Sequence, residues 1–217
     1  MSTIGGPNIV EDGLVFAVDA ANKKSYPGSG TTWKDLSGNG NDGTLTNGPT
    51  FDSGNGGSIV FDGSDDRVDF SSITLENEWT ICYWFYHDGS GDNMTLGQRN
   101  TSNNRFYHRD ITGYKLRVHN NANTYTDMSI GDDKRNTWAF LTYGLSNTLQ
   151  YGWVNGEQKV YGPYGGDPTF IFDCIGFAYS SGFIWSGKLN PCFIYNKTLT
   201  STEVLQNYNA LKSRFGL

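Results

Sequence analysis

The sequence predicts an all-β fold in which two antiparallel sheets pack face to face as a jelly-roll sandwich, followed by one short C-terminal helix. The 217 residues include 28 glycines and 6 prolines, 15% are aromatic, and only 18% are charged. This composition is typical of many short strands joined by tight turns. Turn signals occur along the whole chain without a linker or a repeat, and such sandwiches often span about 200–250 residues as one unit. We therefore expect one sandwich domain at residues 13–217, preceded by an N-terminal arm at residues 1–12.

Hydrophobic periodicity places the strands. Residues 79–86, WTICYWFY, show no polar face and predict a central strand that is buried on both sides. Residues 115–119 alternate between charged and aliphatic side chains, which predicts a half-exposed strand. Asn155-Gly156 is the strongest hairpin signal in the chain. Further strands are predicted at residues 13–19, 58–62, 67–70, 138–143, 149–153 and 187–196, and the glycine- and asparagine-rich residues 33–51 are predicted to form a series of tight turns.

One helix is predicted after the last strand. Thr200 is a suitable N-cap and Glu203 follows three positions later, which together form a capping box. Leu199, just before the cap, is placed to pack on a residue of the first turn as a hydrophobic staple. The apolar stripe expected to cover the sandwich comprises Val204, Leu205, Tyr208 and Leu211.

The charge balance argues against nucleic-acid and membrane partners. The net charge is −6 and the isoelectric point is near 4.9, whereas nucleic-acid binding requires clustered Lys and Arg. No apolar run approaches the roughly 18–20 residues that cross a bilayer. The first ten residues lack the features of a signal peptide, so we expect synthesis in the cytoplasm. The only local basic density is interrupted by Asp110 and comprises Arg99, Arg105, Arg109, Lys115 and Arg117.

The three cysteines are expected to be reduced and buried. Cys82, Cys174 and Cys192 leave at least one thiol unpaired in any intramolecular scheme. A Cys174–Cys192 bridge is the alternative, and it is disfavoured in a chain without a secretion signal. The cysteines also lack the C-x-x-C spacing of a zinc site.

The order of these segments resembles the laminin-G-like family of the concanavalin A-like superfamily over nearly the whole chain. The most specific motifs are the FDG-x-DD-x-V turn at residues 61–68, the strand and turn with Asn155-Gly156, and a closing G-x-L strand followed by IYNKTLT and the helix. The resemblance implies two antiparallel sheets in a jelly roll, of which the concave one often carries a ligand. It also implies an aspartate after the closing G-x-L, where this chain has Asn190.

The N-terminal third is similar to virion proteins of tailed bacteriophages. Residues 8–28 and the DLSGNGNDGTLTNGPTFD block carry this similarity. It implies a non-enzymatic structural or accessory protein, made in the host cytoplasm and displayed on the virion surface as a head decoration or as a tail or fibre component. Its partners would be other capsid or tail proteins, with homo-oligomers expected because jelly rolls leave sheet edges and flat faces to be covered.

Catalysis is not expected. Glycosidases of this fold need paired carboxylates on one strand, in an E-x-D-x-E spacing that this chain lacks. The glutamates Glu76, Glu78, Glu157 and Glu203 stand apart, and no serine lies in a G-x-S-x-G turn. A glycoside hydrolase is therefore a poorer alternative than a binding protein.

No cofactor is expected, although calcium is a possible structural ligand because turns supply hard oxygen ligands at sandwich edges. The turns within residues 33–51 and 61–68 supply such oxygens, and Asn39 and Asp65 are among the residues that carry them. The favoured interpretation is that these side chains only hydrogen-bond their own backbone. The candidate metal ligands are Asp35, Asn41, Asp62 and Asp66.

A lectin-like adhesion module that recognises a host-surface glycan is the alternative function. Sugar sites combine aromatic rings for stacking with planar polar groups for hydroxyls. Several tyrosines lie in loop-like surroundings next to asparagines, although any one of them more often completes the core. The candidate ligand-binding residues are Tyr107, Asn120, Asn123, Tyr125, Tyr161 and Tyr164.

Overall fold

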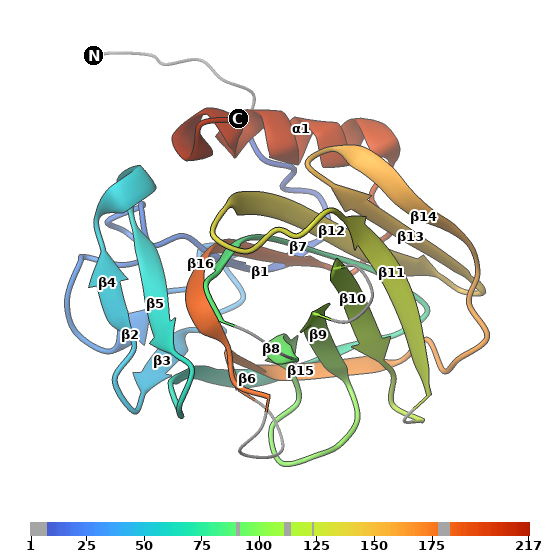
Figure 1. Ribbon diagram of the computed structural model, residues 1–217, viewed down its shortest axis with the longest axis horizontal. Helices are drawn as coiled ribbons and strands as arrows, with labels where there is room; N and C mark the ends of the chain where they lie inside the picture. Colours follow the sequence, from blue (N-terminus) through green and yellow to red (C-terminus); the bar gives the residue numbers. More distant parts are fainter. Residues whose placement is uncertain (1–7, 90–91, 111–113, 123, 178–182) are drawn as a thin grey trace.

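A computed structural model describes residues 8–89, 92–110, 114–122, 124–177 and 183–217. Two eight-stranded sheets pack against each other, and a single α-helix, α1 (Ser201–Leu211), lies across the outside of one of them (Figure 1). All pairs of named strands are antiparallel. The predicted all-β sandwich with one short C-terminal helix is confirmed.

The helix-covered sheet has the order β14-β13-β12-β7-β16-β5-β4, and β1 pairs with β16 outside this path. In chain order its strands are β1 (Leu14–Val18), β4 (Thr50–Asp52), β5 (Ser58–Asp62), β7 (Glu78–His87), β12 (Trp138–Ser146), β13 (Leu149–Val154), β14 (Glu157–Pro163) and β16 (Ser186–Tyr195).

The open sheet has the order β11-β10-β9-β8-β15-β6-β3-β2. In chain order its strands are β2 (Thr32–Trp33), β3 (Gly43–Thr46), β6 (Arg67–Leu75), β8 (Asn93–Gly97), β9 (Arg105–Asp110), β10 (Tyr114–His119), β11 (Tyr125–Gly131) and β15 (Phe170–Ile175). Two 3-10 turns, η1 (Gly54–Gly56) and η2 (Lys212–Phe215), complete the elements.

Strand β7 is buried on both faces, as predicted. Its inward side chains join the core between the sheets, where the ring of Trp79 lies 4.7 Å from that of Phe170. On the other face, Trp84 stacks on Phe215 at 4.1 Å and on Tyr208 at 5.8 Å. The sheet therefore has a second apolar layer on its outside, and the helix and the C-terminal turn cover it.

The helix begins as predicted, but Leu205 does not lie on the buried apolar stripe to which it was assigned. Thr200 Oγ1 accepts a hydrogen bond from the Glu203 amide, and the Glu203 carboxylate accepts one from the Thr200 amide, which completes the capping box. Leu205, however, is 42% exposed and Asn207 is fully buried. At about 100° per residue, Val204 and Asn207 share the inward face while Leu205 lies at its edge.

Asn207 and Tyr195 hold the N-terminal segment on the helix. The Val10 amide donates to Asn207 Oδ1 at 2.8 Å, and Tyr195 Oη donates to the Val10 carbonyl at 3.0 Å. Of the predicted arm, residues 1–7 lie outside the described residues, and residues 8–10 contact α1 through these bonds and through Gln206.

The turn predictions are confirmed at Asn155-Gly156 and incomplete at residues 33–51. Asn155 and Gly156 have φ values of 52° and 79°, as a tight hairpin requires, and they join β13 to β14. In residues 33–51 the structure contains parts of the three short strands β2, β3 and β4 as well as turns. Their two to four residues are too short to show a period of two among so many glycines.

The three cysteines are free and buried, as expected. Cys174 and Cys192 lie in strands of different sheets, and the alternative bridge between them does not form. Burial raises the pKa of Cys82 and Cys174 to about 12 and that of Cys192 further. No helix in the described part of the chain is long and apolar enough to cross a membrane.

Candidate functional site

The outer surface of β9, β10 and β11 brings cationic and aromatic side chains together. Tyr114, Leu116 and Val118 of β10 point into the core, so the residues between them face outward. Each outward residue of β10 lies opposite one of β9 and one of β11, and directly opposed residues share a face. The resulting surface, which we call the cation–aromatic face, comprises Arg105, Tyr107, Arg109, Lys115, Arg117, His119, Tyr125, Asp127 and Ser129.

Arg117 and Tyr125 form the exposed corner of this face. The guanidinium carbon of Arg117 lies 3.7 Å from the centre of the Tyr125 ring, and Tyr125 is 58% exposed. Arg117 also donates two hydrogen bonds to Asp127, at 2.6 and 2.8 Å. This ion pair raises the pKa of Arg117 and lowers that of Asp127. The guanidinium is thereby fixed in a plane over the ring while other N–H groups stay available, since an arginine has five.

The aromatic rings continue across the face. His119 lies between two tyrosines, 5.4 Å from Tyr125 and 5.5 Å from Tyr107. Arg105 lies 4.8 Å over the Tyr107 ring, and Phe183 closes the other end of the row at 5.1 Å. Cationic groups over aromatic faces are attracted by the ring quadrupole, so the row is an ordered platform.

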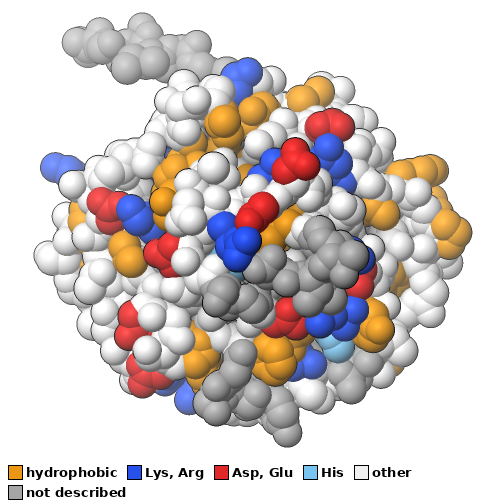
Figure 2. All heavy atoms as spheres, viewed as in Figure 1, with side chains coloured by type: hydrophobic (Ala, Val, Ile, Leu, Met, Phe, Trp, Pro, Cys, Tyr) orange, Lys and Arg blue, Asp and Glu red, His pale blue; other side chains and the backbone are white. Residues whose placement is uncertain are grey.

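Positive charge exceeds negative charge among the described side chains of this face. Arg109 pairs with Asp92 at 2.8 Å, and Arg117 pairs with Asp127. Among the described residues, the face carries the cationic side chains of Arg105, Arg109, Lys115 and Arg117 against the carboxylates of Asp127 and, beside Arg109, Asp92. Figure 2 shows such basic and acidic side chains interspersed with apolar ones over one side of the molecule. In a chain of net charge −6, this surface attracts anions rather than cations.

A hollow of about 270 Å³ adjoins Tyr125 where the two sheets meet. Thr126 and Gln150 line it and are hydrogen-bonded to each other at 3.1 Å across the sheets. Tyr164 forms another wall, and burial raises its pKa to about 12. The hollow extends the cation–aromatic face past the edge strand β11.

The structure brings some of the predicted sugar-binding residues together and separates others. Tyr125 and Tyr164 line this hollow, and Asn120 closes the turn beside it through bonds with Thr124. The expected loop surroundings are wrong for Tyr107, Tyr125 and Tyr161, which lie in β9, β11 and β14. Tyr107 is also only 4% exposed, because Arg105, His119 and Phe183 pack around its ring. Asn123 lies outside the described residues.

Tyr161 belongs to a different hollow, on the helix-covered sheet. This groove of about 480 Å³ lies where β13 and β14 pass the start of α1. None of the eight described residues that line it is charged, and we call it the uncharged groove. Tyr161 was the only member predicted as a ligand-binding residue; Tyr151 and Trp153 were assigned to a strand, and Thr200 to the helix cap. The groove is lined chiefly by Tyr151, Trp153, Gln158, Tyr161, Thr200 and Ser201.

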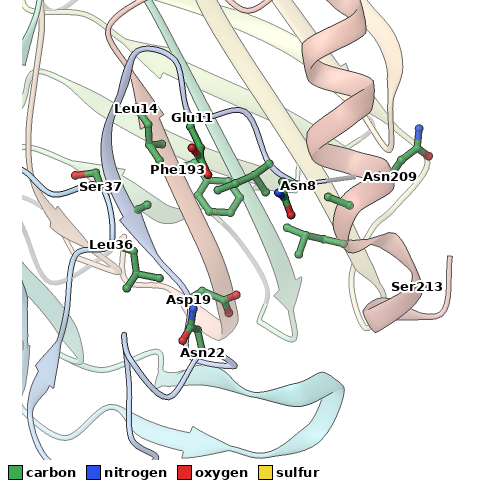
Figure 3. A pocket seen from close by; sticks show the side chains of 14 residues that line it. Asn8, Glu11, Leu14, Asp19, Asn22, Leu36, Ser37, Phe193, Asn209 and Ser213 are labelled. Carbon is green, nitrogen blue, oxygen red and sulfur yellow. The ribbon is translucent and has the colours of Figure 1, made fainter. Parts of the chain in front are cut away.

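A further hollow, of about 740 Å³, lies between β1, the N-terminal segment and the end of α1 (Figure 3). Its main acidic group is already engaged: Asp19 binds Arg214 at 3.0 Å and the Asn190 amide at 2.9 Å. The other two polar atoms bonded by Asn190 are the Ala20 amide and the Gly57 carbonyl. Asn190 therefore joins β16 to the end of β1 and to Gly57.

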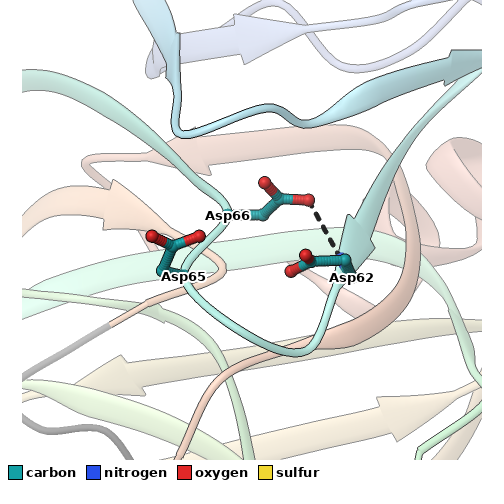
Figure 4. Close-up of side chains that lie close together, drawn as sticks. All are labelled: Asp62, Asp65 and Asp66. Atoms are coloured by element: carbon teal, nitrogen blue, oxygen red, sulfur yellow. Dashed lines mark hydrogen bonds between the residues drawn. The ribbon is translucent and has the colours of Figure 1, made fainter.

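The predicted metal ligands divide into two separate groups. Asp62 and Asp66 lie together and are joined by Asp65, with ligand atoms within 4.8 Å of one another (Figure 4). Asp66 accepts from the Asp62 amide at 3.0 Å, and burial together with the neighbouring carboxylates raises its pKa. Asp62 accepts from the Ser64 amide at 2.8 Å. These bonds are those of a tight turn.

Asp35 and Asn41 form the second group, which organises the loop between β2 and β3. Asp35 is 5% exposed, and its two oxygens accept from Ala17 N, Ser37 N, Ser37 Oγ and Asn41 N at 2.8–3.1 Å. A carboxylate with four such donors already has its lone pairs occupied.

Two buried histidines lie inside the sandwich. His108 Nε2 is hydrogen-bonded to Tyr83 Oη at 2.8 Å, and His87 Nδ1 to Tyr114 Oη at 2.5 Å. Both rings contact Trp185, at 5.1 and 4.8 Å. Burial, and then the proximity of His87, lowers the pKa of His108 well below its usual value. Both side chains are buried in the core and closed to substrate.

The laminin G profile described as concanavalin A-like lectin/glucanases superfamily matches residues 62–205. The chain belongs to this superfamily. The match spans β6 to the first turns of α1 and so includes both the cation–aromatic face and the uncharged groove. No curated protein sequence matches the chain.

Several solved structures share the fold. Domain 4 of an extracellular arabinanase from Geobacillus stearothermophilus, in complex with arabinotriose, superimposes with a TM-score of 0.73 at 16% identity, over 90% of this chain and 98% of that one. The ligand-binding domain of botulinum neurotoxin serotype D, in complex with N-acetylneuraminic acid, gives 0.67 at 13% identity over 92% and 51%. Trypanosoma rangeli sialidase gives 0.65 at 13% identity over 93% and 33%. This chain therefore spans about half of the toxin domain and a third of the sialidase.

We predict that His108 makes the protein less stable at acidic pH. Because its pKa is lower in the folded chain than the usual value of about 6.5, the unfolded chain takes up a proton first as the pH falls. The free energy of unfolding should then decrease below pH 6.5 by up to about 1.4 kcal/mol per pH unit from this group. In urea unfolding at pH 4.5–7.5, the free energy of unfolding should depend less steeply on pH for His108→Gln than for the wild type. Leu205→Ala, at an exposed position of α1, is the control and should keep the wild-type dependence on pH; equal dependences for all three proteins would contradict the prediction.

We predict that a chelator leaves the melting temperature unchanged, because the oxygens of Asp35 are occupied by backbone and hydroxyl donors. Asp35→Ala should instead lower the free energy of unfolding by about 3 kcal/mol, since it leaves several buried donors unpaired. The exposed Asp65→Ala is the matched control, expected within about 0.5 kcal/mol. Differential scanning calorimetry with and without EDTA gives the answer. A fall of several degrees on chelation would establish a structural calcium ion.

Proposed function

We propose that this chain is a non-enzymatic, lectin-like module that binds a glycan carrying an anionic group on the cation–aromatic face. One observation carries the proposal: the Tyr125 ring is 58% exposed and is held between Arg117 and His119 on an open sheet. An exposed aromatic ring beside a fixed guanidinium meets the two needs of an acidic sugar, which are a stacking surface and a charged fork.

The geometry suggests how the glycan would lie. The C–H face of a sugar ring would stack on Tyr125, and its carboxylate or sulfate would receive N–H groups of Arg117 that Asp127 leaves unused. Asp127 keeps the guanidinium plane fixed through two hydrogen bonds, so little side-chain entropy is lost on binding. Neighbouring sugar units would extend over His119 or into the hollow lined by Gln150 and Tyr164.

The comparisons give this proposal general support. One structural neighbour is an arabinanase domain in complex with arabinotriose, of which this chain covers 98%. Another is a neurotoxin domain in complex with N-acetylneuraminic acid. Binding by those proteins is a property of their own sites, and the residues of the cation–aromatic face are the argument for this chain.

The carboxylates of the face support binding rather than catalysis. A glycosidase needs one carboxylic acid with a raised pKa and a second carboxylate at a defined separation. Asp127 has a lowered pKa because Arg117 donates hydrogen bonds to it, and Asp92 is paired with Arg109. Both groups serve as partners that orient arginines.

Display on a virion is a second candidate, favoured by the similarity of residues 8–28 and of the DLSGNGNDGTLTNGPTFD block to phage virion proteins. It is compatible with the first, because a glycan-binding module on a particle would attach the particle to cells. Mass spectrometry and immunogold imaging of purified phage particles should detect the chain on a head, tail or fibre. Its absence from purified particles would exclude this role and leave glycan binding unaffected.

We predict that 3′-sialyllactose binds more tightly than lactose, and that raising the salt concentration weakens its binding. Tyr125→Ala removes the stacking ring and Arg117→Gln removes the charge, so each should weaken binding by about tenfold or more. Leu205→Ala, on the exposed edge of α1, is the control and should bind like the wild type. Isothermal titration calorimetry provides the affinities, and thermal melts confirm that each variant is folded.

If folded Tyr125→Ala and Arg117→Gln bind sialyllactose as the wild type does, the assigned face is wrong. If sialylated, uronate-containing and sulfated oligosaccharides all fail to bind the wild type, the proposed function is wrong.

A further inference from the structure

The uncharged groove differs from the cation–aromatic face in both place and chemistry. It lies on the outside of the helix-covered sheet, whereas the cation–aromatic face is the outside of the other sheet. Its volume of about 480 Å³ falls within the range of about 300–1,000 Å³ that is usual for small-molecule sites. Two different ligand classes are therefore possible on one sandwich.

Three aromatic rings shape the groove. The rings of Tyr151 and Trp153 are parallel to within 3°, with centres 6.1 Å apart on the same side of β13. Tyr161, on the neighbouring strand β14, is tilted by 57° against Tyr151 at 5.3 Å and is 63% exposed. Tyr161 and the partly buried Tyr151 thus present aromatic surface to the groove, while Trp153 is only 5% exposed, and such a surface suits the stacking of sugar rings.

Polar groups at the rim are available for hydroxyls. The Gln158 amide, the Ser201 hydroxyl and the Tyr161 hydroxyl have no hydrogen-bond partner among the described residues, and all three residues line the groove. Thr198 and Thr200 are by contrast already engaged, with the Leu145 carbonyl and in the capping box. An amide is planar and both donates and accepts, as a sugar hydroxyl pair requires.

The nearest charges are compensated and do not call for an anionic ligand. Lys159 pairs with Glu157 at 2.7 Å, and Lys197 pairs with Glu203 at 2.8 Å. An anion in the groove would lose water without gaining a cationic partner, which is unfavourable. A neutral polyhydroxylated ligand would lose little free energy on leaving water, because its hydroxyls would bond to the polar groups of the rim and its C–H faces would contact the aromatic rings.

We propose that the uncharged groove is a second carbohydrate site, which binds a neutral oligosaccharide independently of the cation–aromatic face. Tyr161 would supply the exposed stacking face, and Gln158 and Ser201 would bind hydroxyls. The chain then contacts a neutral and an acidic glycan segment on opposite outer surfaces of the sandwich. Two weak sites on one glycan-coated surface give a much stronger combined attachment when both can be engaged at once.

The test uses the full chain with arabinotriose, cellotriose and maltotriose as neutral probes, followed by NMR and calorimetric titration. At least one trisaccharide should bind, with little dependence on salt. Tyr161→Ala should weaken that binding by about tenfold or more, and Gln158→Ala by about threefold. Tyr125→Ala is the matched control: it removes a similarly exposed tyrosine from the other face and should leave trisaccharide binding unchanged while reducing sialyllactose binding.

Two results would overturn this inference. The first is that none of the three trisaccharides binds at millimolar concentration, or that folded Tyr161→Ala binds them as the wild type does. The second is that sedimentation shows a dimer which Tyr161→Ala dissociates while trisaccharide binding is absent, because the groove is then a contact between two copies. Neither result depends on sialyllactose, so failure of this site and failure of the cation–aromatic face are distinguishable.

Discussion

The burial of β7 on both faces is the constraint on which the rest of the molecule depends. A strand with tryptophans at Trp79 and Trp84 cannot expose either side to water. One side requires the second sheet, and the other requires α1 and the C-terminal turn with Phe215. The fold therefore has three layers across this strand, and the helix is as much a part of its apolar packing as the opposite sheet.

This arrangement also explains where binding surfaces can occur. The outer apolar surface of the helix-covered sheet is covered over β7, β12 and β16, whereas the outer side of β13 and β14 lines the uncharged groove. Among the described residues no helix covers β9–β11 of the other sheet, and the outward residues there are polar, cationic or aromatic. Because α1 is short and covers only part of one sheet, it leaves the outer surfaces of both candidate sites without a helix over them.

The sequence predicted the elements that have a strong local signal. The unbroken apolar run at Trp79, the alternation at Lys115, the Asn155-Gly156 turn and the capping box at Thr200 each correspond to the observed element. Leu205 was misplaced because periodicity alone does not tell the centre of a helix face from its edge. Short strands such as β2 and β4 carry too few residues to show any period.

The sites were harder to predict because strand pairing assembles them. Arg117 and Tyr125 are eight positions apart and meet only through the β10–β11 register. The same register places Arg105 and Arg109 beside β10, so a basic density that looked interrupted along the chain becomes continuous across strands. Tyr151 and Tyr161 likewise meet through the β13–β14 pairing, and the helix start is brought to them by tertiary packing.

The hydrogen bonds of Asn207 and Tyr195 with Val10 hold the N-terminal segment on the helix side of the molecule. They therefore determine how the molecule would be oriented if it were attached to a support through this segment. Asn8 and the C-terminal turn both lie on the helix side of the sandwich (Figure 1). A tether joined at either end would leave from that side. The cation–aromatic face would then point away from the support, because it lies on the sheet opposite the helix. The uncharged groove beside the helix would lie closer to the support. Such an orientation would bring the cation–aromatic face into contact with an approaching surface before the uncharged groove.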